Sequence, residues 1–461
     1  MQLPSIDRAA QEPIRRQIYT QFKVQIASGA MPAGEALPST RQLAGELSVS
    51  RSTVVEAYDM LLSEGYLSSR QGAQTVVADG LVLDAPSLPS EPDPPRKRTP
   101  VLADFSTGRP DLEQFPRALW GRLLANAALG LPPEQYGYTG PQGYAPLRQE
   151  IVAWLSRSRG LAVNAADVFI TAGATHALHI LAELLCPAGG RVLMEDPCHS
   201  GLFDILSGSN REIVPISVDD HGMQADLLGS AGQVSMIYVT PSHQFPLGGI
   251  LPASRRAALV RFARERGAFI VEDDYDSEFR YEGAPVAPLY SMDPQRVIYV
   301  GTFSKTLFPA LRIGFAILPK CLQARWRELR THYDVQNPPF EQAALAEMLQ
   351  TRRFDRHIRA MRSRYGRRRQ TLLDELTREF GNTWVACGDA AGLHVAIRFL
   401  GRRFDDAFQS RCRENGVLAV PLETHCLVKG LHEDTLVLGY GHLEPERIGP
   451  AVRQLRLLMD A

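Results

Sequence analysis

Apolar residues near the start of the chain recur with the spacing of short amphipathic helices. Residues 13–28 predict a first helix, because one face carries an apolar residue at every fourth position: Ile14, Ile18, Phe22 and Ile26. Residues 40–47 predict a second helix with Ser39 as its N-cap, and Ser50 is the predicted N-cap of a third helix. Three short helices with one tight turn are typical of a helix-turn-helix, in which the first turn of the last helix meets DNA.

A hairpin is predicted directly after the third helix. Residues 64–67 (Glu-Gly-Tyr-Leu) begin a strand, residues 70–74 (Arg-Gln-Gly-Ala-Gln) form a turn, and residues 75–77 return as a second strand. The pattern therefore predicts a wing with a basic tip beside the helices.

The pattern changes twice further along the chain. Residues 79–103 are predicted to be a linker, since residues 84–100 are polar and rich in proline and cannot build a core. From Asp104 onward, strands alternate with helices, which predicts an α/β fold with a mostly parallel sheet and a smaller C-terminal α+β subdomain. The expected domains are thus 1–78, 79–103 and 104–461. The clearest strands are predicted at residues 168–171, 192–197, 236–240, 268–271 and 296–300.

Composition adds little to this picture. The 461 residues have a net charge of −1, so no overall basic character indicates nucleic-acid binding. No signal segment opens the chain and no apolar run approaches the roughly 20 residues that span a bilayer, so we expect a cytoplasmic protein. The six cysteines are scattered, without a Cys-x-x-Cys pair, which favours buried thiols over disulfides or a metal site.

The stretch after the strand at residues 296–300 carries the most distinctive chemistry. Lys305 is flanked by hydroxyls, with Thr302 and Ser304 before it and Arg312 seven residues after it. A lysine amine condenses with an aldehyde, and pyridoxal 5′-phosphate (PLP) carries both an aldehyde and a phosphate that hydroxyls and a guanidinium bind. Lys305 alone would be read as a solvated surface lysine, so the hypothesis depends on what lies upstream.

Three upstream strands end in residues that would complete a PLP site. The strand at residues 268–271 is followed by Asp273, which can pair with a pyridinium nitrogen, and by Tyr275, which can donate to the ring oxygen. Gly173, Ala174 and Thr175 open a helix whose free amides suit a phosphate. His199 follows another strand, where a ring could cover a planar cofactor.

The N-terminal motifs resemble the winged-helix domain of GntR-type bacterial transcription regulators. The matching segments are residues 37–44, 50–54 and 64–67. The resemblance implies DNA contacts from the second and third helices and the wing: Ser39, Arg41, Ser50, Arg51, Ser52, Thr53, Arg70, Gln71 and Gly72.

Residues 104–461 resemble class I aminotransferases, which are fold-type I PLP enzymes. The resemblance implies that Lys305 forms the Schiff base with PLP, that Asp273 and Tyr275 contact the ring, and that Tyr138 reaches the phosphate of a neighbouring subunit. The two parts together resemble the MocR subfamily of GntR regulators, which includes the PdxR-like proteins. That family implies a head-to-tail homodimer that binds promoter DNA and senses PLP or an amine.

The chain departs from the aminotransferase pattern at three places. Val437 stands where an arginine normally holds the substrate carboxylate, which argues against ordinary transamination. Three options stay open: PLP as the effector, an amine without a carboxylate, or a carboxylate held by another basic group. His199 replaces a larger aromatic ring, and His243 or Gln244 replaces an asparagine near the ring oxygen, although His243 could equally be structural.

These departures favour a sensory role for the second domain over catalysis. An active aminotransferase with a DNA-binding head, and a PLP fold kept only for dimerisation, both stay open. Residues 352–369 contain nine arginines, which form either a solvated helix or a basic surface that contacts DNA or docks the winged helix. The sequence does not reveal the effector, the target genes or the sign of regulation.

Overall fold

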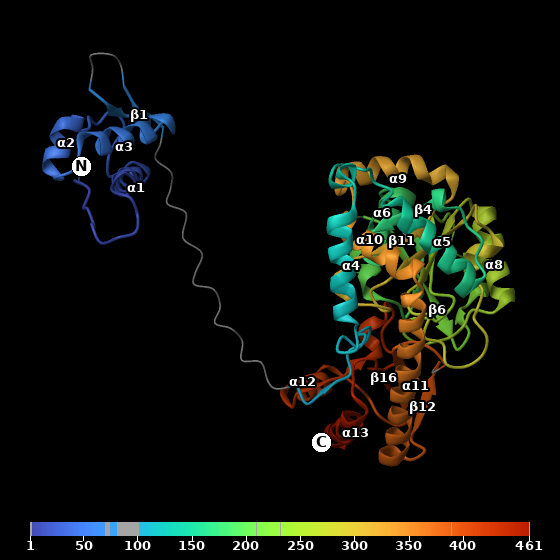
Figure 1. Cartoon of the computed structure of the whole chain (residues 1–461). Helices are drawn as coiled ribbons and strands as arrows, with labels where there is room; N and C mark the ends of the chain where they lie inside the picture. Colours follow the sequence, from blue (N-terminus) through green and yellow to red (C-terminus); the bar gives the residue numbers. More distant parts are fainter. Residues whose placement is uncertain are drawn as a thin grey trace. The chain divides into compact units, whose positions relative to one another are not determined.

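The protein was analysed as a computed structural model that describes residues 2–69, 74–80, 101–208, 210–230, 232–388 and 390–460. The chain divides into two compact units, Met1–Lys97 and Arg98–Ala461 (Figure 1). Of the predicted linker, residues 81–100 lie outside the described residues. Ala103, which we expected to end the linker, pairs instead with Val417 in the second unit.

The first unit has the predicted three helices and hairpin. Its elements are α1 (Ile14–Ala27), α2 (Thr40–Glu46), α3 (Arg51–Ser63), β1 (Leu67–Ser68) and β2 (Val76–Val77). The two strands pair antiparallel. Ile18, Phe22 and Ile26 are buried in one core, as the spacing predicted.

The predicted strand at residues 64–67 is mostly wrong, because its first part ends α3. Glu64 is the C-cap of α3, and Gly65 has φ of 76°, the left-handed conformation that commonly follows a helix. The strand therefore begins only at Leu67. The predicted wing tip (Arg70, Gln71 and Gly72) lies outside the described residues.

The second unit is built on an eight-stranded sheet that confirms the predicted α/β class. Its strand order is β4-β11-β10-β9-β8-β5-β6-β7, and the four pairings from β10 through β9, β8 and β5 to β6 are parallel. β11 runs antiparallel to both its neighbours, and β7 to β6. The strands are β4 (Val168–Thr171), β5 (Arg191–Asp196), β6 (Glu212–Asp219), β7 (Gly222–Met223), β8 (Met236–Val239), β9 (Phe269–Asp274), β10 (Val297–Thr302) and β11 (Gly314–Ile317).

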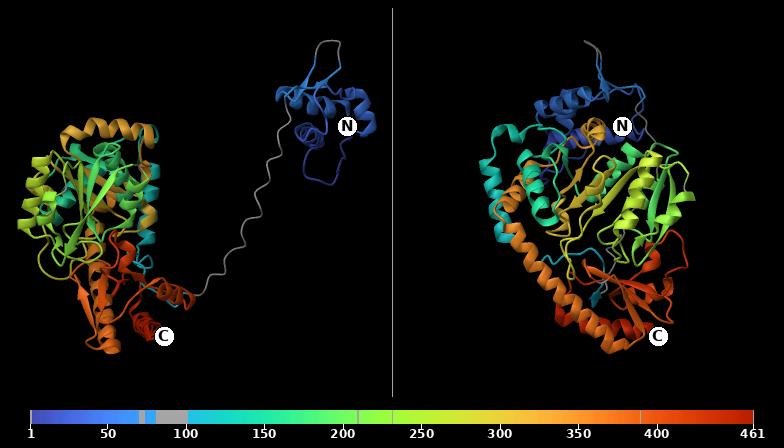
Figure 2. Two further views of the ribbon diagram at one scale, coloured as in Figure 1. Left: turned by 180° about the vertical axis from the view of Figure 1, so that it is seen from behind. Right: turned by 90° about the vertical axis from the view of Figure 1, so that its right-hand side faces the viewer.

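Helices cover both faces of this sheet (Figure 2). Alternate residues of a strand point to opposite faces, so Ile170 of β4 joins one core cluster and Phe169 the other. The first cluster includes residues of α4 (Arg117–Gly130), α5 (Ala145–Arg159), α8 (Ala253–Arg266) and α10 (Pro339–Gln350). The second includes residues of α6 (Ala174–Leu185), α7 (Ser200–Ser207) and α9 (Lys320–Tyr333).

A smaller C-terminal subdomain completes the second unit. Its antiparallel sheet has the order β12-β13-β16-β15, and the long helix α11 connects it to the large sheet (Figures 1 and 2). The elements are α11 (Arg353–Phe380), β12 (Trp384–Cys387), β13 (His394–Phe399), α12 (Asp406–Glu414), β15 (Val420–Pro421), β16 (Thr435–Gly439) and α13 (Pro445–Asp460). A separate parallel pair joins β3 (Ala103–Asp104) to β14 (Val417–Leu418).

The cysteines agree only in part with the prediction of buried thiols. Cys186, Cys198, Cys412 and Cys426 are buried, whereas Cys387 is half-buried and Cys321 is exposed. None of the six forms a disulfide. Within the described part of the chain, no helix has the length and apolar character needed to cross a membrane.

The arginine-rich stretch at residues 352–369 is neither wholly solvated nor one basic surface. Arg368 is buried on α11, where it donates to Asp111 and to Glu444, both at 2.7 Å, and to the Gly441 carbonyl at 2.5 Å. Arg369 is also buried and pairs with Glu282 at 3.1 Å. These two arginines tie α11 to neighbouring segments and are not free to bind a partner.

Replacing Arg368 by Ala should strongly destabilise the second unit. The change leaves the buried Asp111 carboxylate without its cation, which costs about 3–5 kcal/mol in comparable buried pairs. The measurement is the thermal unfolding temperature of the full chain. The matched control is Arg367→Ala, since Arg367 is exposed and contacts Ser363 at 3.4 Å, and it should move the unfolding temperature far less. Equal melting of the two variants would contradict the structural role of Arg368.

Candidate cofactor and DNA sites

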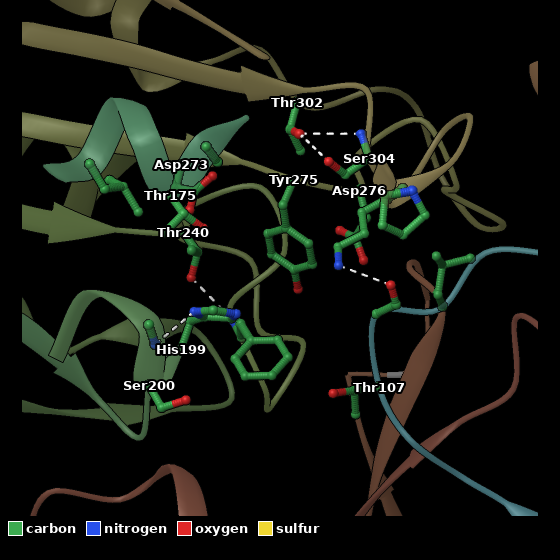
Figure 3. A pocket seen from close by; sticks show the side chains of 18 of the residues that line it. Thr107, Thr175, His199, Ser200, Thr240, Asp273, Tyr275, Asp276, Thr302 and Ser304 are labelled. Carbon is green, nitrogen blue, oxygen red and sulfur yellow. Dashed lines mark hydrogen bonds between the residues drawn. The ribbon is translucent and has the colours of Figure 1, made fainter. Parts of the chain in front are cut away.

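A cavity of about 360 Å³ lies at the carboxyl ends of β8, β9 and β10. Parallel strands of an open sheet commonly bind ligands at this edge. The cavity brings together most of the predicted PLP residues, from β9, β10, α6 and the turns that follow them (Figure 3). They are Ala174, Thr175, His199, Asp273, Tyr275, Thr302, Ser304, Lys305 and Arg312.

One end of the cavity is suited to a phosphate. Gly173 precedes α6 with φ of 90°, and a side chain there would place its Cβ 3.2 Å from the guanidinium of Arg312. The guanidinium therefore lies close to Gly173 at the start of α6, and the guanidinium and the free amides of the helix both favour an anion. Thr302 donates its hydroxyl to Ser304 at 3.1 Å, and the Ser304 amide donates to Thr302 at 3.2 Å, which orders the two hydroxyls beside Arg312 (Figure 3).

Asp273 is the group that would meet a ring nitrogen. Tyr238 donates to Asp273 Oδ2 at 2.9 Å, while Asp273 Oδ1 is buried and has no hydrogen-bond partner within the described residues. Burial raises the pKa of this carboxyl to about 7, partly offset by the Tyr238 hydrogen bond. A buried carboxylate oxygen without a donor fits a protonated pyridine nitrogen, whose positive charge would lower that pKa again.

Lys305 reaches the middle of the cavity from the loop after β10. Its Nζ donates to the Gly108 carbonyl at 2.9 Å. Gly108 has φ of 69°, and a Cβ there would stand 2.6 Å from Nζ, so a larger residue would strain the backbone and displace the amine from this position. Burial lowers the pKa of Lys305, with Asp276 and Asp273 opposing this effect and Arg312 adding to it. A lowered pKa favours the neutral amine that attacks an aldehyde.

Neither predicted replacement for the asparagine near the ring oxygen, His243 or Gln244, lines the cavity. Gln244 is buried away from the cavity and donates to the carbonyls of Pro197 and Phe245, so its role is structural. His243 Nδ1 lies 2.9 Å from Asp276 Oδ1 and 3.0 Å from the Tyr275 hydroxyl. His243 thus holds the tyrosine from behind, which is a positioning role.

The structure adds cavity residues that sequence reasoning missed. Tyr238 lies inside the predicted strand at residues 236–240 and Asp276 directly follows Tyr275, so their positions were a usable signal. His394 of β13 and His425 come from the small subdomain and carried no such signal. Neither histidine carries a positive charge readily, because burial lowers the pKa of His425 to about 4 and that of His394 well below its usual value. Further lining residues are Thr107, Gly108, Thr240, Phe245 and Leu393.

Val437 lies outside the cavity. It is fully buried on β16, in a cluster with Leu247, Ala396 and Leu422. The lysine and arginine side chains among the described lining residues are Lys305 and Arg312, and Arg312 belongs to the phosphate end. The described lining residues therefore supply no second guanidinium for a substrate carboxylate.

His199 and Tyr138 differ in how far they belong to the cavity. His199 is the N-cap of α7 and accepts from the Gly201 amide at 3.1 Å, with its ring 5.5 Å from that of Phe245. This bond fixes the imidazole at the cavity wall, and burial lowers its pKa. Tyr138 does not line the cavity and is 90% exposed.

The predicted DNA residues gather at the start of two helices of the first unit. Ser39 and Ser50 are N-caps, each accepting a backbone amide at 3.2 Å. Arg41, Arg51 and Ser52 are exposed, and Thr53 is half-buried. Arg51 Nε donates to the Thr40 hydroxyl at 3.3 Å, which places the first turn of α3 beside α2. The hydroxyls of Ser39 and Ser50 thus cap the two helices, whereas Arg41 and Arg51 are exposed to solvent.

Two family models match the chain. Residues 14–77 match the bacterial regulatory proteins of the gntR family, and residues 102–432 match the aminotransferases of class I and II. Over 98% of this chain, the sequence is 34% identical to a probable rhizopine catabolism regulatory protein, MocR, of Rhizobium meliloti, covering 94% of that protein. The chain belongs to the MocR subfamily of GntR-type transcription regulators. It is a winged-helix regulator with an aminotransferase-like domain.

Other relatives agree with this MocR assignment. The pyridoxine biosynthesis regulator PdxR of Corynebacterium glutamicum is 35% identical over 79% of each chain. Among solved structures, a multiple substrate aminotransferase of Thermococcus profundus superposes with a TM-score of 0.72 and 25% identity, over 79% of this chain and 92% of that one. LysN, an α-aminoadipate aminotransferase of Thermus thermophilus, gives 0.71 and 26%, over 78% and 92%. The aminotransferase-like fold implies PLP binding in general.

The residues of this MocR-type cavity fit PLP. The phosphate end, the unpartnered Asp273 oxygen and the buried Lys305 amine lie in one cavity, as the three functional ends of that cofactor require. When bound, PLP supplies an aldehyde that captures primary amines.

The rate at which Lys305 captures PLP should reach half of its maximum at a pH below the usual lysine pKa of 10.5. Only the neutral amine reacts, so the rate rises with pH until Lys305 is deprotonated, and burial moves that point downward. The measurement is the rate of absorbance change when PLP is added to cofactor-free protein across a pH series. Asp276→Asn should move the midpoint further down, because the Asp276 charge raises the lysine pKa. A midpoint at or above the ordinary value would contradict the effect of burial.

Proposed function

We propose that this regulator holds PLP on Lys305, binds paired promoter sites as a head-to-tail homodimer, and changes its DNA binding when PLP or an amine occupies the cavity. Because its target is promoter DNA, we place it in the cytoplasm. The observation that carries the proposal is the cavity itself, which has a phosphate end, a ring partner in Asp273 and an amine in Lys305, yet no free cation for a substrate carboxylate among the described lining residues.

The effector is PLP itself or an amine that lacks a carboxylate. A transaminase needs a cation for the α-carboxylate, and Val437 supplies none. In place of a guanidinium, the cavity offers the imidazole of His425, whose two ring nitrogens are buried without hydrogen-bond partners among the described residues. With its pKa near 4 this ring is neutral at neutral pH, so it suits a neutral polar group better than a carboxylate.

The relatives support a link between this cavity and gene control. PdxR of Corynebacterium glutamicum is named for pyridoxine biosynthesis, and TauR of Rhodobacter capsulatus, 31% identical over 86% of this chain, is also named as a transcriptional regulator. Ligand binding in the cavity would change how the two units are placed across the linker and so whether both wings reach their half-sites together.

A visible absorption spectrum of the purified protein, titrated with PLP and then with amino acids and carboxylate-free amines, tests the effector. We expect a band from PLP bound through Lys305, absent in Lys305→Ala, that amino acids leave unchanged. A change caused by a carboxylate-free amine without turnover would identify that amine class as the effector. A band that no amine alters would identify PLP. Conversion of the cofactor by an amino acid, reversed by a keto acid, would instead show a working transaminase.

DNA binding should depend on Arg51 and respond to the state of Lys305. Arg51→Ala should weaken promoter binding roughly tenfold or more, while its PLP band stays unchanged. Lys305→Ala should still bind DNA, but added PLP should no longer alter its affinity. The control is Arg15→Ala, which removes an exposed arginine of α1 that pairs with Glu56 at 3.2 Å and should bind DNA normally. An equal PLP response in Lys305→Ala and in the unaltered protein would overturn the proposed switch.

The homodimer is supported by apolar surface beside the cavity. Phe115, Trp120 and Phe308 line a shallow apolar hollow next to Pro309, and Leu129, farther along α4, is 89% exposed. A second copy would cover this surface and bring its own Tyr138 to the phosphate.

Tyr138→Phe should therefore raise the PLP dissociation constant by about tenfold, because a hydrogen bond to a charged group is lost. The control is Tyr136→Phe, since Tyr136 already donates to the Ala128 carbonyl at 2.5 Å within its own chain. Sedimentation shows whether both variants stay dimeric. Unchanged PLP affinity in Tyr138→Phe would argue against the head-to-tail arrangement.

A further inference from the structure

A second cavity of about 360 Å³ lies in the aminotransferase-like unit, apart from the Lys305 cavity. Its walls are the last turn of α5, the loop from Ser277 to Pro285 and the first turns of α11. Trp154 and Ile358 provide an apolar part of the lining. The wall is otherwise dominated by six arginines from these three segments: Arg157, Arg159, Arg280, Arg352, Arg359 and Arg362.

The carboxylates nearby do not balance these arginines. Asp355 accepts from Arg352 at 2.9 Å and lies 3.8 Å from Arg157. Asp274 accepts from Arg159 at 2.6 Å. Glu278 also lines the cavity, but burial and the charge of Asp274 raise its pKa, which reduces its negative charge near neutral pH.

Three of the arginines lack a carboxylate partner. Among the described residues, no acidic side chain lies within ion-pair distance of Arg280, Arg359 or Arg362, and Arg362 donates instead to the backbone carbonyl of Glu278 at 2.8 Å. Six guanidiniums therefore face at most three carboxylates, and the cavity carries a local positive charge although the whole chain has a net charge of −1.

Several buried donors in the wall also lack an acceptor. Within the described part of the chain, Arg159 Nε, Arg280 Nε and the Ser277 hydroxyl are buried without a hydrogen-bond partner. The Arg159 side chain is 5% exposed. A buried donor without an acceptor costs about 1–3 kcal/mol, so a ligand that supplies oxygen atoms here would be stabilised.

We propose that this cavity binds a small phosphate-bearing metabolite. Guanidinium groups bind phosphate oxygens through paired N–H donors, and arginines from three segments surround one concave space. A volume of about 360 Å³ is within the range of small-molecule sites, and the Trp154 and Ile358 surface suits the organic part of such a ligand. A DNA duplex is the less favoured partner, because its phosphates bind arginines spread along an exposed surface and not inside a pocket.

A chain of contacts connects the second cavity to the Lys305 cavity. Arg159 and Tyr299 both donate to Asp274 Oδ2, at 2.6 and 2.5 Å, and Asp274 directly follows Asp273 on β9. A phosphate that draws Arg159 away from Asp274 would change the electrostatic field at Asp273. The proposal of this second site does not depend on the proposed PLP switch, because phosphate binding to the second cavity can be measured directly.

Calorimetric titration of the full, PLP-loaded chain with inorganic pyrophosphate tests the proposal. PLP occupies the phosphate end of the Lys305 cavity, so added pyrophosphate reports on the second cavity. We expect binding that the double variant Arg280→Gln/Arg359→Gln weakens by about tenfold or more, because two charge-assisted contacts are lost. The matched control is Arg356→Gln, which alters an exposed arginine of the same helix that does not line the cavity and should bind as the unaltered chain does.

Three results decide the outcome. Absence of pyrophosphate binding, or equal binding by the double variant and the unaltered chain, overturns the proposal. If only the affinity for promoter DNA falls in the double variant, the arginines belong to a DNA surface and the small-ligand site is wrong. The PLP band of each variant checks that the unit is folded, and Arg280→Gln alone serves if the double variant is not.

Discussion

The structure of the aminotransferase-like unit depends on keeping charged groups buried at the ends of parallel strands. Asp273 at the end of β9 and Lys305 after β10 are both withdrawn from water, and burial moves their pKa values toward the neutral forms. Burying the charged form of either group alone is unfavourable. It is tolerated because Tyr238 and Gly108 supply hydrogen bonds, and because the site suits a cofactor with a cationic nitrogen at one end and an aldehyde at the other.

The same constraint explains the neighbouring residues. Asp274 and Asp276 lie beside Asp273 and Tyr275, on β9 and in the turn after it. Asp274 pairs with Arg159 at 2.6 Å, and Asp276 lies 2.9 Å from His243 Nδ1. Without these partners three carboxylates would crowd one strand end. The partners come from α5 and from the loop after β8, so the charge balance of the cofactor cavity also holds the surrounding segments in place.

The cavity keeps the parts of an aminotransferase that bind the cofactor and lacks the part that binds the usual substrate. Arg312, Asp273 and Lys305 line one cavity whose residues fit PLP, whereas Val437 is buried in an apolar cluster of the small subdomain. A regulator needs only occupancy of the site to bias a conformational equilibrium, so it does not need turnover. His394 and His425, which line the same cavity and have lowered pKa values, could select a ligand by hydrogen bonds without binding a carboxylate.

The sequence alone determined the elements and the local chemistry. Periodicity predicted the three helices of the first unit and the main strands of the second. Strand-end positions marked Asp273, Tyr275 and Lys305 as candidate cofactor residues. Both kinds of signal are local in the chain. Tertiary structure decided what depends on distant segments. It showed that Gln244 is structural, that Glu64 ends a helix, and that His394 and His425 line the cavity. It also divided the arginine-rich stretch into buried ties such as Arg368 and cavity arginines such as Arg359, because helix spacing does not reveal which face of α11 meets which neighbour.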